Sequence, residues 1–335
     1  MLQNKECEAS KTGLLENPLP EKDASDTNSA EEYYGKSNGV VNRLWGTSLH
    51  VCRRLPEEAL REAMVRHEHY LALRLNLQPG HEVLDLGCGI GGPTREIARF
   101  SEANICGINI SPSQINAAEE LTKRADLSHK VRYVVGDFTY MNLEDASFDR
   151  AYSIEATCYA PNLSDAYSEA FRVLRPGGIF AVYEVVLTEN YDPENPEHIN
   201  YRKRMECVAG HPHLVTASTA MAAMQEVGFV LQAAEDLANT PGYLPWYSAI
   251  DGSFKWAGGV LDTVSSTFLT LFLRSFSSKG ILYQLVRCAE KLGILHPGTH
   301  SLGAEMVRAV EAYRIAGEKG LVTPMFLMVG RKPRV

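Results

Sequence analysis

The stretch Val83–Pro93, V-L-D-L-G-C-G-I-G-G-P, carries the clearest structural signal in the chain. An apolar pair and an acid come first, glycines follow, and a segment of helical character begins at Thr94. This order predicts a strand, a tight turn and a helix. Glycine permits such a turn and lets the backbone approach a ligand closely. The start of the helix offers unpaired N–H groups to polar ligand atoms, so the stretch predicts a nucleotide-binding turn.

Asp85 discriminates between two ligands for this turn. Gly87, Gly89 and Gly92 satisfy the dinucleotide pattern G-x-G-x-x-G, which is a weak signal when it stands alone. A dinucleotide would place its pyrophosphate at the helix start, where the Asp85 carboxylate would repel it. S-adenosylmethionine (SAM) has no phosphate and carries an ammonium and a sulfonium. The acid therefore favours SAM over a nicotinamide cofactor. Cys88 lies in the same turn and is a further candidate for cofactor binding.

Composition narrows the function classes. The chain has 335 residues, a net charge of −8 and 45% hydrophobic residues, enough for a sizeable core. The acidic balance argues against a nucleic-acid partner. Seven scattered cysteines lack metal-ligand spacing, so we expect no metal site and a reducing, intracellular and cytoplasmic setting. Residues 1–30 are polar and expected to be disordered, and no stretch reads as a signal peptide or membrane span.

Strands alternate with helices along the middle of the chain. Segments with helical spacing of apolar residues are 60–77, 111–124, 164–174 and 217–227. Segments with strand character are 82–86, 104–110, 131–136, 148–154, 179–187, 229–236 and 323–331. The second helix has a capping pattern, with Ser111 as N-cap, Pro112 first and Gln114 three residues after the cap. The alternation predicts a doubly wound, mostly parallel, seven-stranded α/β sheet.

The stretch 237–320 is too long for a loop between the last two strands. It is rich in aromatic residues, and we expect an inserted, mostly helical cap over the crevice. An additional layer of core without a ligand is the alternative. The expected organisation is a polar N-terminus (1–30), a helical substrate segment (31–80), a SAM-binding core (81–236), and a cap with the last strand (237–335).

Candidate cofactor residues follow the strands, because ligands of open α/β sheets bind beyond the carboxyl ends of the strands. Asn109 ends the second strand, where its amide can bond ribose hydroxyls, and Gln114 follows nearby. Asp137 and Phe138 follow the third strand. The carboxylate can accept from the adenine amino group and the ring can stack on the base, although a turn role for Asp137 is the alternative. Glu155 ends the fourth strand, close to the expected reacting centre.

The letters V-L-D-L-G-C-G resemble motif I of class I methyltransferases, which have a Rossmann-like fold. From about Tyr33 to Pro333 the chain resembles the sterol 24-C-methyltransferases. The phrases R-H-E-H-Y-L-A at 66–72, G-G-P-T-R-E-I-A-R-F at 91–100 and I-E-A-T-C at 154–158 carry this resemblance. Phrases at 235–238, 245–247 and 323–325 resemble the family's C-terminal part, which supports the cap.

The N-terminal block departs from the family pattern. Family members have a block of aromatic residues that is thought to line the sterol site. Tyr34 and Trp45 remain here, but residues 40–44 replace several aromatics and an acid, and Tyr159 stands where the family has His. We therefore expect an acceptor other than the common membrane sterol, such as a modified triterpenoid or another terpenoid alkene.

The resemblance implies transfer of a methyl group from SAM to an alkene carbon. The enzyme must align this weak nucleophile, stabilise a carbocation with aromatic faces, and remove a proton. The candidate aromatic lining is Tyr34, Trp45, Tyr159, Trp246 and Tyr247. The candidate bases are Glu155, Glu206 and His69. Glu155 can equally hold the cofactor ammonium, His69 can be a packing residue, and Trp246 and Tyr247 can be core.

Two other functions stay open at this point. One is an O- or N-methyltransferase of a small hydrophobic metabolite, and the other is a SAM-binding module without catalysis. The apolar stretch 258–276 can touch the endoplasmic reticulum or a lipid-droplet surface, or pack inside the cap. The family resemblance also allows a homo-oligomer.

Overall fold

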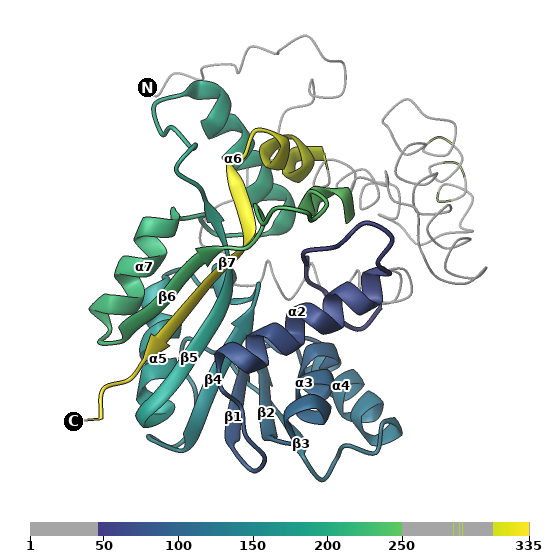
Figure 1. The fold of residues 1–335 in the computed structure, drawn as a ribbon, viewed down its shortest axis with the longest axis vertical. Helices are drawn as coiled ribbons and strands as arrows, with labels where there is room; N and C mark the ends of the chain where they lie inside the picture. Colours follow the sequence, from purple (N-terminus) through teal and green to yellow (C-terminus); the bar gives the residue numbers. More distant parts are fainter. Residues whose placement is uncertain (1–45, 250–283, 285–287, 289, 291–310, 335) are drawn as a thin grey trace.

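The computed structural model describes residues 46–249, 284, 288, 290 and 311–334. These residues form a seven-stranded sheet of order β3-β2-β1-β4-β5-β7-β6 (Figure 1). The strands are β1 (Glu82–Leu86), β2 (Asn104–Asn109), β3 (Val131–Val135), β4 (Phe148–Ile154), β5 (Leu174–Leu187), β6 (Val230–Asp236) and β7 (Val322–Arg331). Strands β1 to β5 pair in parallel, and β7 runs antiparallel to both β5 and β6. The predicted mostly parallel α/β sheet is confirmed.

Helices cover both faces of the sheet, and α2 crosses in front of the strands in Figure 1. The helices are α2 (Leu60–Arg74), α3 (Gly92–Ser101), α4 (Pro112–Arg124), α5 (Leu163–Val173), α6 (Pro196–Ala209) and α7 (Ala217–Glu226). Val83 packs with α2 and α3 on one face, whereas its neighbour Leu84 packs with α5 and α7 on the other. Successive strand side chains point to opposite faces, so a strand covered on both sides is apolar throughout.

One helix was missed, and two expectations about the elements need correction. Helix α6 was not predicted, because Tyr201 and Met205 are its only buried apolar residues among those whose side chains are described. Strand β5 begins at Leu174 rather than at residue 179, since Leu174 pairs with Phe148 across a register shift. Ser111 occupies the N-cap position of α4, but its side chain makes no capping bond and lies 3.0 Å from the Ser113 hydroxyl.

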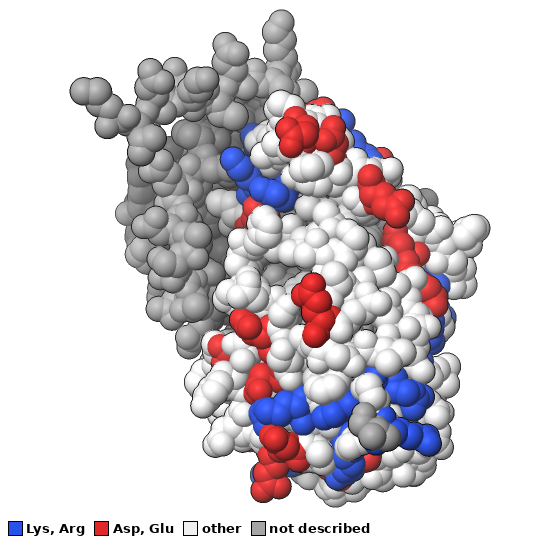
Figure 2. Space-filling model, turned by 90° about the vertical axis from the view of Figure 1, so that its left-hand side faces the viewer, with Lys and Arg blue, Asp and Glu red and all other residues white. Residues whose placement is uncertain are grey.

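Basic side chains gather at the lower end of the face shown in Figure 2. At the amino ends of β4 and β5, Arg175 pairs with Asp149 and Arg172 pairs with Asp145, each at 2.6 Å. These arginines are therefore neutralised locally, and they lie at the edge of the sheet opposite to the glycine turn. Among the described residues, no helix is long and apolar enough to cross a bilayer.

Candidate functional site

The glycine turn between β1 and α3 is fixed to the end of β2. The amides of Gly87 and Cys88 both donate to the carbonyl of Ile108, at 2.9 and 3.1 Å. Gly87 and Gly89 have φ values of +78° and +53°, in the left-handed region that favours glycine. A Cβ added at Gly89 would meet no atom within 4 Å. The backbone at Gly89 is therefore open to a ligand, as a cofactor-binding turn requires.

Asp85 is buried and ties three elements together at this turn. Its Oδ2 accepts hydrogen bonds from the Thr94 hydroxyl at 2.6 Å and from the Tyr152 hydroxyl at 2.9 Å. Burial, together with a smaller contribution from the Glu68 charge, raises the pKa of Asp85 to about 7 in spite of these bonds. A cationic ligand nearby would favour the charged carboxylate, so the site fits SAM. The sequence did not reveal the structural role of Asp85.

Phe138 and Cys88 lie against glycines of the site. The Phe138 ring comes within 3.7 Å of the point where a Gly87 side chain would begin, so the structure brings this predicted stacking residue to the turn. Cys88 packs against Gly107, where an added Cβ would be 2.8 Å from its sulfur. Cys88 is thus a packing residue of the turn.

The polar residues predicted to hold the nucleoside lie at the ends of β2 and β3. The Asn109 amide donates to Gln114 Oε1 at 2.5 Å, which leaves the Asn109 oxygen Oδ1 as the acceptor for a ribose hydroxyl. Asp137 is exposed, and its Oδ1 accepts from the Thr139 amide at 2.8 Å and the Thr139 hydroxyl at 2.7 Å. Asp137 therefore forms a turn, and its second carboxylate oxygen takes no part in that turn.

Glu155 stands in a strained position directly after β4. Its φ is +50°, which is unusual for a residue other than glycine. Its Oε1 accepts from the Val51 amide at 2.8 Å. Burial raises the pKa of Glu155 to about 7, whereas the nearby His50 and the Val51 amide oppose this rise. The residue after it, Ala156, would be 2.3 Å from a Cβ at Gly87. Glu155 thus adjoins the glycine turn.

Residues 46–55, which we call the strap, cross the same edge of the sheet. A Cβ at Gly92 would lie 2.1 Å from the Thr47 carbonyl oxygen, so the strap touches the start of α3. Further along, Val51 binds Glu155. The strap therefore closes over the turn from the N-terminal side.

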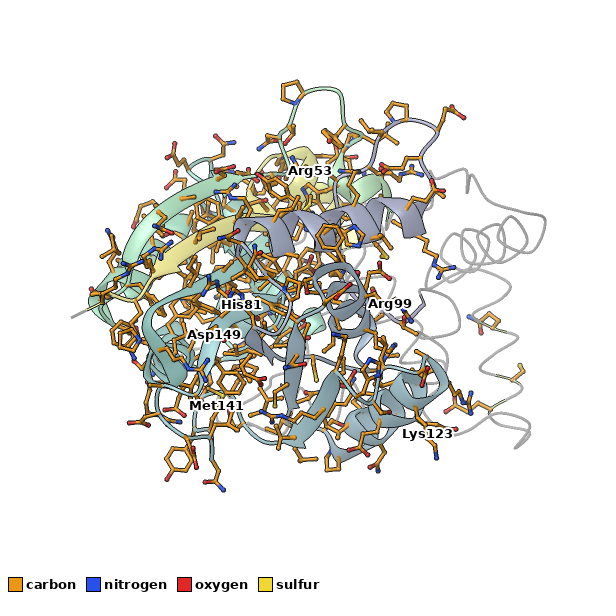
Figure 3. All side chains as sticks on the ribbon, turned by 60° about the horizontal axis from the view of Figure 1, so that its bottom comes forward. Arg53, His81, Arg99, Lys123, Met141 and Asp149 are labelled. Carbon is orange, nitrogen blue, oxygen red and sulfur yellow. The ribbon has the colours of Figure 1, made fainter. Side chains whose placement is uncertain are left out.

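The end of the strap is fastened to α2 and to the segment before η2 (Trp246–Ala249). Arg54 forms an isolated antiparallel bridge with Leu244. Arg53 lies beside α2 (Figure 3), with its guanidinium 5.1 Å from the ring centre of Tyr70 and 5.2 Å from that of Tyr243. Cation–π contacts of this kind stabilise the strap where it leaves the site.

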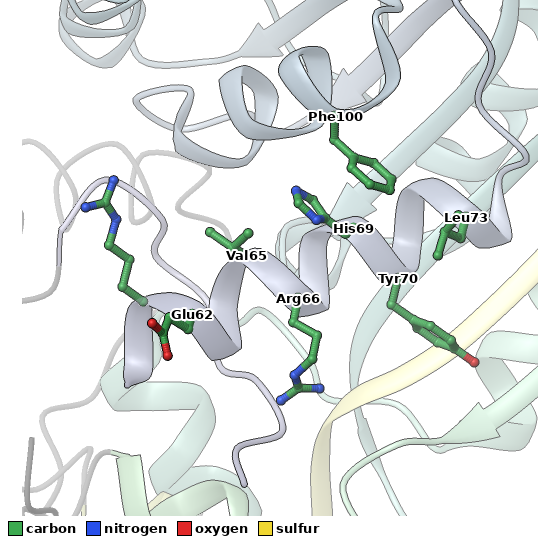
Figure 4. Close-up of a pocket in the computed structure, with 8 residues that line it drawn as sticks. Glu62, Val65, Arg66, His69, Tyr70, Leu73 and Phe100 are labelled. Carbon is green, nitrogen blue, oxygen red and sulfur yellow. The ribbon is translucent and has the colours of Figure 1, made fainter. Parts of the chain in front are cut away.

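The His69 side chain packs between α2 and α3. It points from α2 towards Phe100 of α3 (Figure 4), with the two ring centres 3.9 Å apart. Its Nε2 lies 3.0 Å from Glu96 Oε1. His69 and Phe100 border a groove of about 710 Å³ between α2 and α3, and the described residues that line this groove do not include Glu155. The packing alternative therefore describes His69, and its predicted role as a base has no geometric support.

The carboxylate of Glu206, on α6, already has hydrogen-bond and ion-pair partners. Its Oε1 accepts from the Leu214 amide at 2.9 Å and lies 3.4 Å from Arg202 Nε and 3.5 Å from His213 Nδ1. These contacts fasten the end of α6 to the loop that follows it. Glu206 therefore acts as an anchor of that loop in this structure.

The predicted aromatic lining divides into three groups. Tyr34 and Trp45 lie outside the described residues, as do residues 1–30 and 258–276 and most of the predicted cap. Trp246 and Tyr247 both pack against Gly317, where a Cβ would lie 2.8 and 2.6 Å from their rings; Trp246 is buried in the core and Tyr247 is half-buried against it. Tyr159, in η1 (Thr157–Tyr159), packs against the buried His211, with ring centres 4.5 Å apart and ring planes tilted by 30°.

Sequence reasoning missed a buried carboxyl beside the turn that follows β4. Glu184 is fully buried on β5, accepts from the Thr157 hydroxyl and accepts from the Tyr167 hydroxyl at 3.2 Å. Burial raises its pKa to about 7. It borders a cavity of about 260 Å³ between η1 and α7. The sequence feature that could have identified Glu184 is an acid inside the apolar run F-A-V-Y-E-V-V-L at 180–187. It fixes the turn that carries Glu155.

Comparison with known proteins identifies the family. Residues 84–182 match a methyltransferase domain model and residues 269–334 match a sterol methyltransferase C-terminal model. The sterol 24-C-methyltransferase erg6 of Aspergillus fumigatus is 42% identical over 90% of this chain and 78% of its own. The Saccharomyces cerevisiae enzyme ERG6 is 38% identical over 96% and 83%. The methyltransferase phqN of Penicillium fellutanum is 41% identical over 85% and 87%.

Solved structures share the fold at low sequence identity. A geranyl diphosphate methyltransferase in complex with GPP and sinefungin has a TM-score of 0.64 at 16% identity, covering 92% of this chain and 100% of its own. The mycolic acid cyclopropane synthase CmaA1 has a TM-score of 0.66 at 15% identity, covering 90% and 96%. The Rossmann-like fold and the family resemblance are confirmed. The chain belongs to the sterol 24-C-methyltransferase family and is a SAM-dependent methyltransferase.

Proposed function

We propose that this enzyme transfers the methyl group of SAM to an alkene carbon of a sterol, triterpenoid or related terpenoid, with Glu155 as the base. The observation that carries the proposal is the position of Glu155, a half-buried residue in strained backbone whose neighbour Ala156 touches the glycine turn. A proton acceptor beside the cofactor turn is what a reaction through a carbocation needs.

The backbone of Gly87 and Gly89, the amide of Asn109 and the side chains of Asp137 and Phe138 are the groups that would hold SAM. Bound SAM supplies an electrophilic methyl group on its sulfonium. The chain's own contribution is to bind and orient the two reactants and to exclude water, which allows a weak alkene nucleophile to react. The strap and the turn after β4 enclose this edge of the sheet.

Glu155 then accepts the proton. A pKa of about 7 leaves a substantial fraction of the carboxyl ionised at neutral pH, and it makes that fraction a stronger base than an ordinary glutamate. In the charged form, Glu155 can also stabilise the positive charge left on the acceptor. The Val51 amide fixes one oxygen, so the other oxygen is the one that takes the proton.

The acceptor is proposed from the N-terminal block. Residues 40–44 lack the aromatics that the family resemblance leads us to expect there, which favours a terpenoid alkene of different shape from the common membrane sterol. The relatives named as sterol 24-C-methyltransferases support an apolar polycyclic or isoprenoid acceptor. Such acceptors partition into lipid, so we also propose peripheral lipid contact, which flotation of the enzyme with liposomes tests.

The experiment supplies labelled SAM with a panel of Δ24 sterols, triterpenoids and acyclic terpenoid alkenes. We expect a product with a new carbon-bound methyl group, detected by mass spectrometry and NMR. Glu155→Gln should lower turnover about 100-fold or more but keep SAM binding, whereas the control Glu96→Gln, at a partly exposed glutamate, should leave both turnover and SAM binding unchanged. Methylation of oxygen or nitrogen alone would overturn the proposal, and efficient turnover restricted to Δ24 sterols would refute the altered acceptor.

A further inference from the structure

The strap is fastened to α2 by a buried pair outside the roles described so far. His50 Nε2 lies 3.0 Å from Glu68 Oε1, and the two side chains are each 1% exposed. The other ring nitrogen, Nδ1, lies 3.1 Å from the Val51 carbonyl oxygen. Both nitrogens of one imidazole therefore face oxygen atoms in the interior.

The chemistry of these oxygens fixes the number of protons. A carbonyl oxygen only accepts, so Nδ1 must carry a hydrogen. At the other nitrogen, either Nε2–H donates to the Glu68 carboxylate or a protonated Glu68 donates to Nε2. In both arrangements His50 and Glu68 share one proton and have no net charge. Removal of that proton would leave a lone pair facing a carboxylate in a buried site, which is unfavourable.

Val51 connects this pair to Glu155. The carbonyl of Val51 accepts from His50, and the amide of Val51 donates to Glu155 Oε1 at 2.8 Å. One residue of the strap therefore carries both bonds. A strap that left α2 would withdraw the amide from Glu155.

We propose that His50 and Glu68 are positioning residues: their shared proton holds the strap on α2, and the strap in turn holds the Glu155 carboxyl beside the glycine turn. Loss of the shared proton releases the strap. The effect on turnover depends on the proposed role of Glu155, but the effect on the strap does not.

The groups that face His50 determine the direction of the pH dependence. Burial lowers the pKa of His50, but the bond to Glu68 and the charges of Glu68 and Glu155 outweigh burial and raise it. His67 of α2 lies with its ring centre 5.7 Å from that of His50. Burial lowers the pKa of His67 far below its usual value, so His67 stays neutral and does not take the proton. The strap is therefore held at low pH and released as pH rises.

Native-state trypsin digestion measures release of the strap, because Arg53 and Arg54 lie in it. Cleavage after these residues is followed by mass spectrometry from pH 6 to 9 on the full chain. His50→Leu should raise the cleavage rate about 10- to 100-fold at pH 6, the range expected when a buried bond to a charged group is lost. The parent should approach this rate as pH rises.

The substitution Glu68→Gln removes the proton shared with His50 but preserves the contact between the two side chains. Its amide can donate to the Nε2 lone pair of a neutral His50, so the contact remains without a shared proton. We expect slow strap cleavage that does not change with pH. His69→Leu is the matched control, since His69 and Glu96 form a pair at the same 3.0 Å separation on the outer groove. It should leave strap cleavage unchanged.

Parental cleavage in His50→Leu would overturn the proposal, and so would an unaltered pH profile in Glu68→Gln. If His50→Leu does not fold, the pH profile of Glu68→Gln still decides. The alkaline limb of kcat should also be flattened in Glu68→Gln, with a smaller change in KM for SAM. Released strap without any effect on turnover would refute the role of Glu155 and leave the strap mechanism standing.

Discussion

Replacing Gly87 with alanine is expected to disturb the site through Ala156. The new Cβ would lie 2.3 Å from the Ala156 Cβ. Carbon atoms that are not bonded to each other come to rest about 3.5–4 Å apart. One of the two segments must therefore move by about 1 Å, and Ala156 is the residue next to Glu155.

The cost has two components that the chain allows to be measured separately. An alanine at φ +78° carries left-handed strain of about 1–2 kcal/mol. Overpacking against Ala156 adds roughly 1–3 kcal/mol. Gly80 has the same φ of +78°, but a Cβ there would meet no atom within 4 Å. Gly80→Ala therefore carries the strain alone and is the matched control.

Urea unfolding of the two variants gives the free energies, and SAM binding with steady-state kinetics gives the effect on the site. We expect the free energy of unfolding to fall more in Gly87→Ala than in Gly80→Ala, and the difference should equal the overpacking component of roughly 1–3 kcal/mol. A displacement of about 1 Å beside the reacting centre can lower turnover about 100-fold, whereas Gly80→Ala should leave turnover near that of the parent.

The second variant, Ala156→Gly, tests whether the contact itself is responsible. Combined with Gly87→Ala, it removes the atom that is struck, so the double variant should recover the stability difference and most of the turnover relative to Ala156→Gly alone. Equal losses in Gly87→Ala and Gly80→Ala, or no recovery in the double variant, would refute the reasoning.

Three further results are expected. Thr157→Val removes a hydroxyl that donates to the buried Glu184, so urea unfolding should show a loss of about 1–3 kcal/mol. Glu184→Gln should become more stable relative to the parent as pH rises from 4.5 to about 7, by about 3 kcal/mol, because the folded parent binds more protons than its unfolded chain there; a difference independent of pH in urea titrations would contradict this. His69→Leu should keep kcat within about fivefold, since its pair with Glu96 is partly exposed, whereas Glu155→Gln should lower kcat about 100-fold or more; the reverse order in steady-state kinetics would restore His69 as the base.

The strand segments, the mostly parallel sheet and the cofactor turn were predictable from local sequence. Val83 and Leu84 are both apolar because both faces of β1 are covered, and Gly87 and Gly89 have the positive φ values that only glycine adopts readily. Phe138 follows a strand whose end lies at the glycine turn. Each of these inferences depends on neighbours in the chain.

The partners of buried polar side chains were not predictable. Asp85 was expected to serve a cationic ligand, and it also binds Thr94 and Tyr152, which is 67 residues away. His69 was a candidate base, and it pairs with Glu96 of α3. Spacing on α2 shows that His67 and His69 point to different faces, but it does not show which face meets the site.

The sequence by itself determined the doubly wound sheet, the glycine turn and the choice of SAM over a dinucleotide, because strand period, backbone freedom of glycine and the charge of one acid are local properties. Only the tertiary structure decided that the strap binds Glu155 through Val51, that His69 pairs with Glu96, and that Glu206 accepts a hydrogen bond from the Leu214 amide. Those relations join residues as far as 104 positions apart. They arise from packing of the strap, α2 and the turn after β4 against one another, which no single segment specifies.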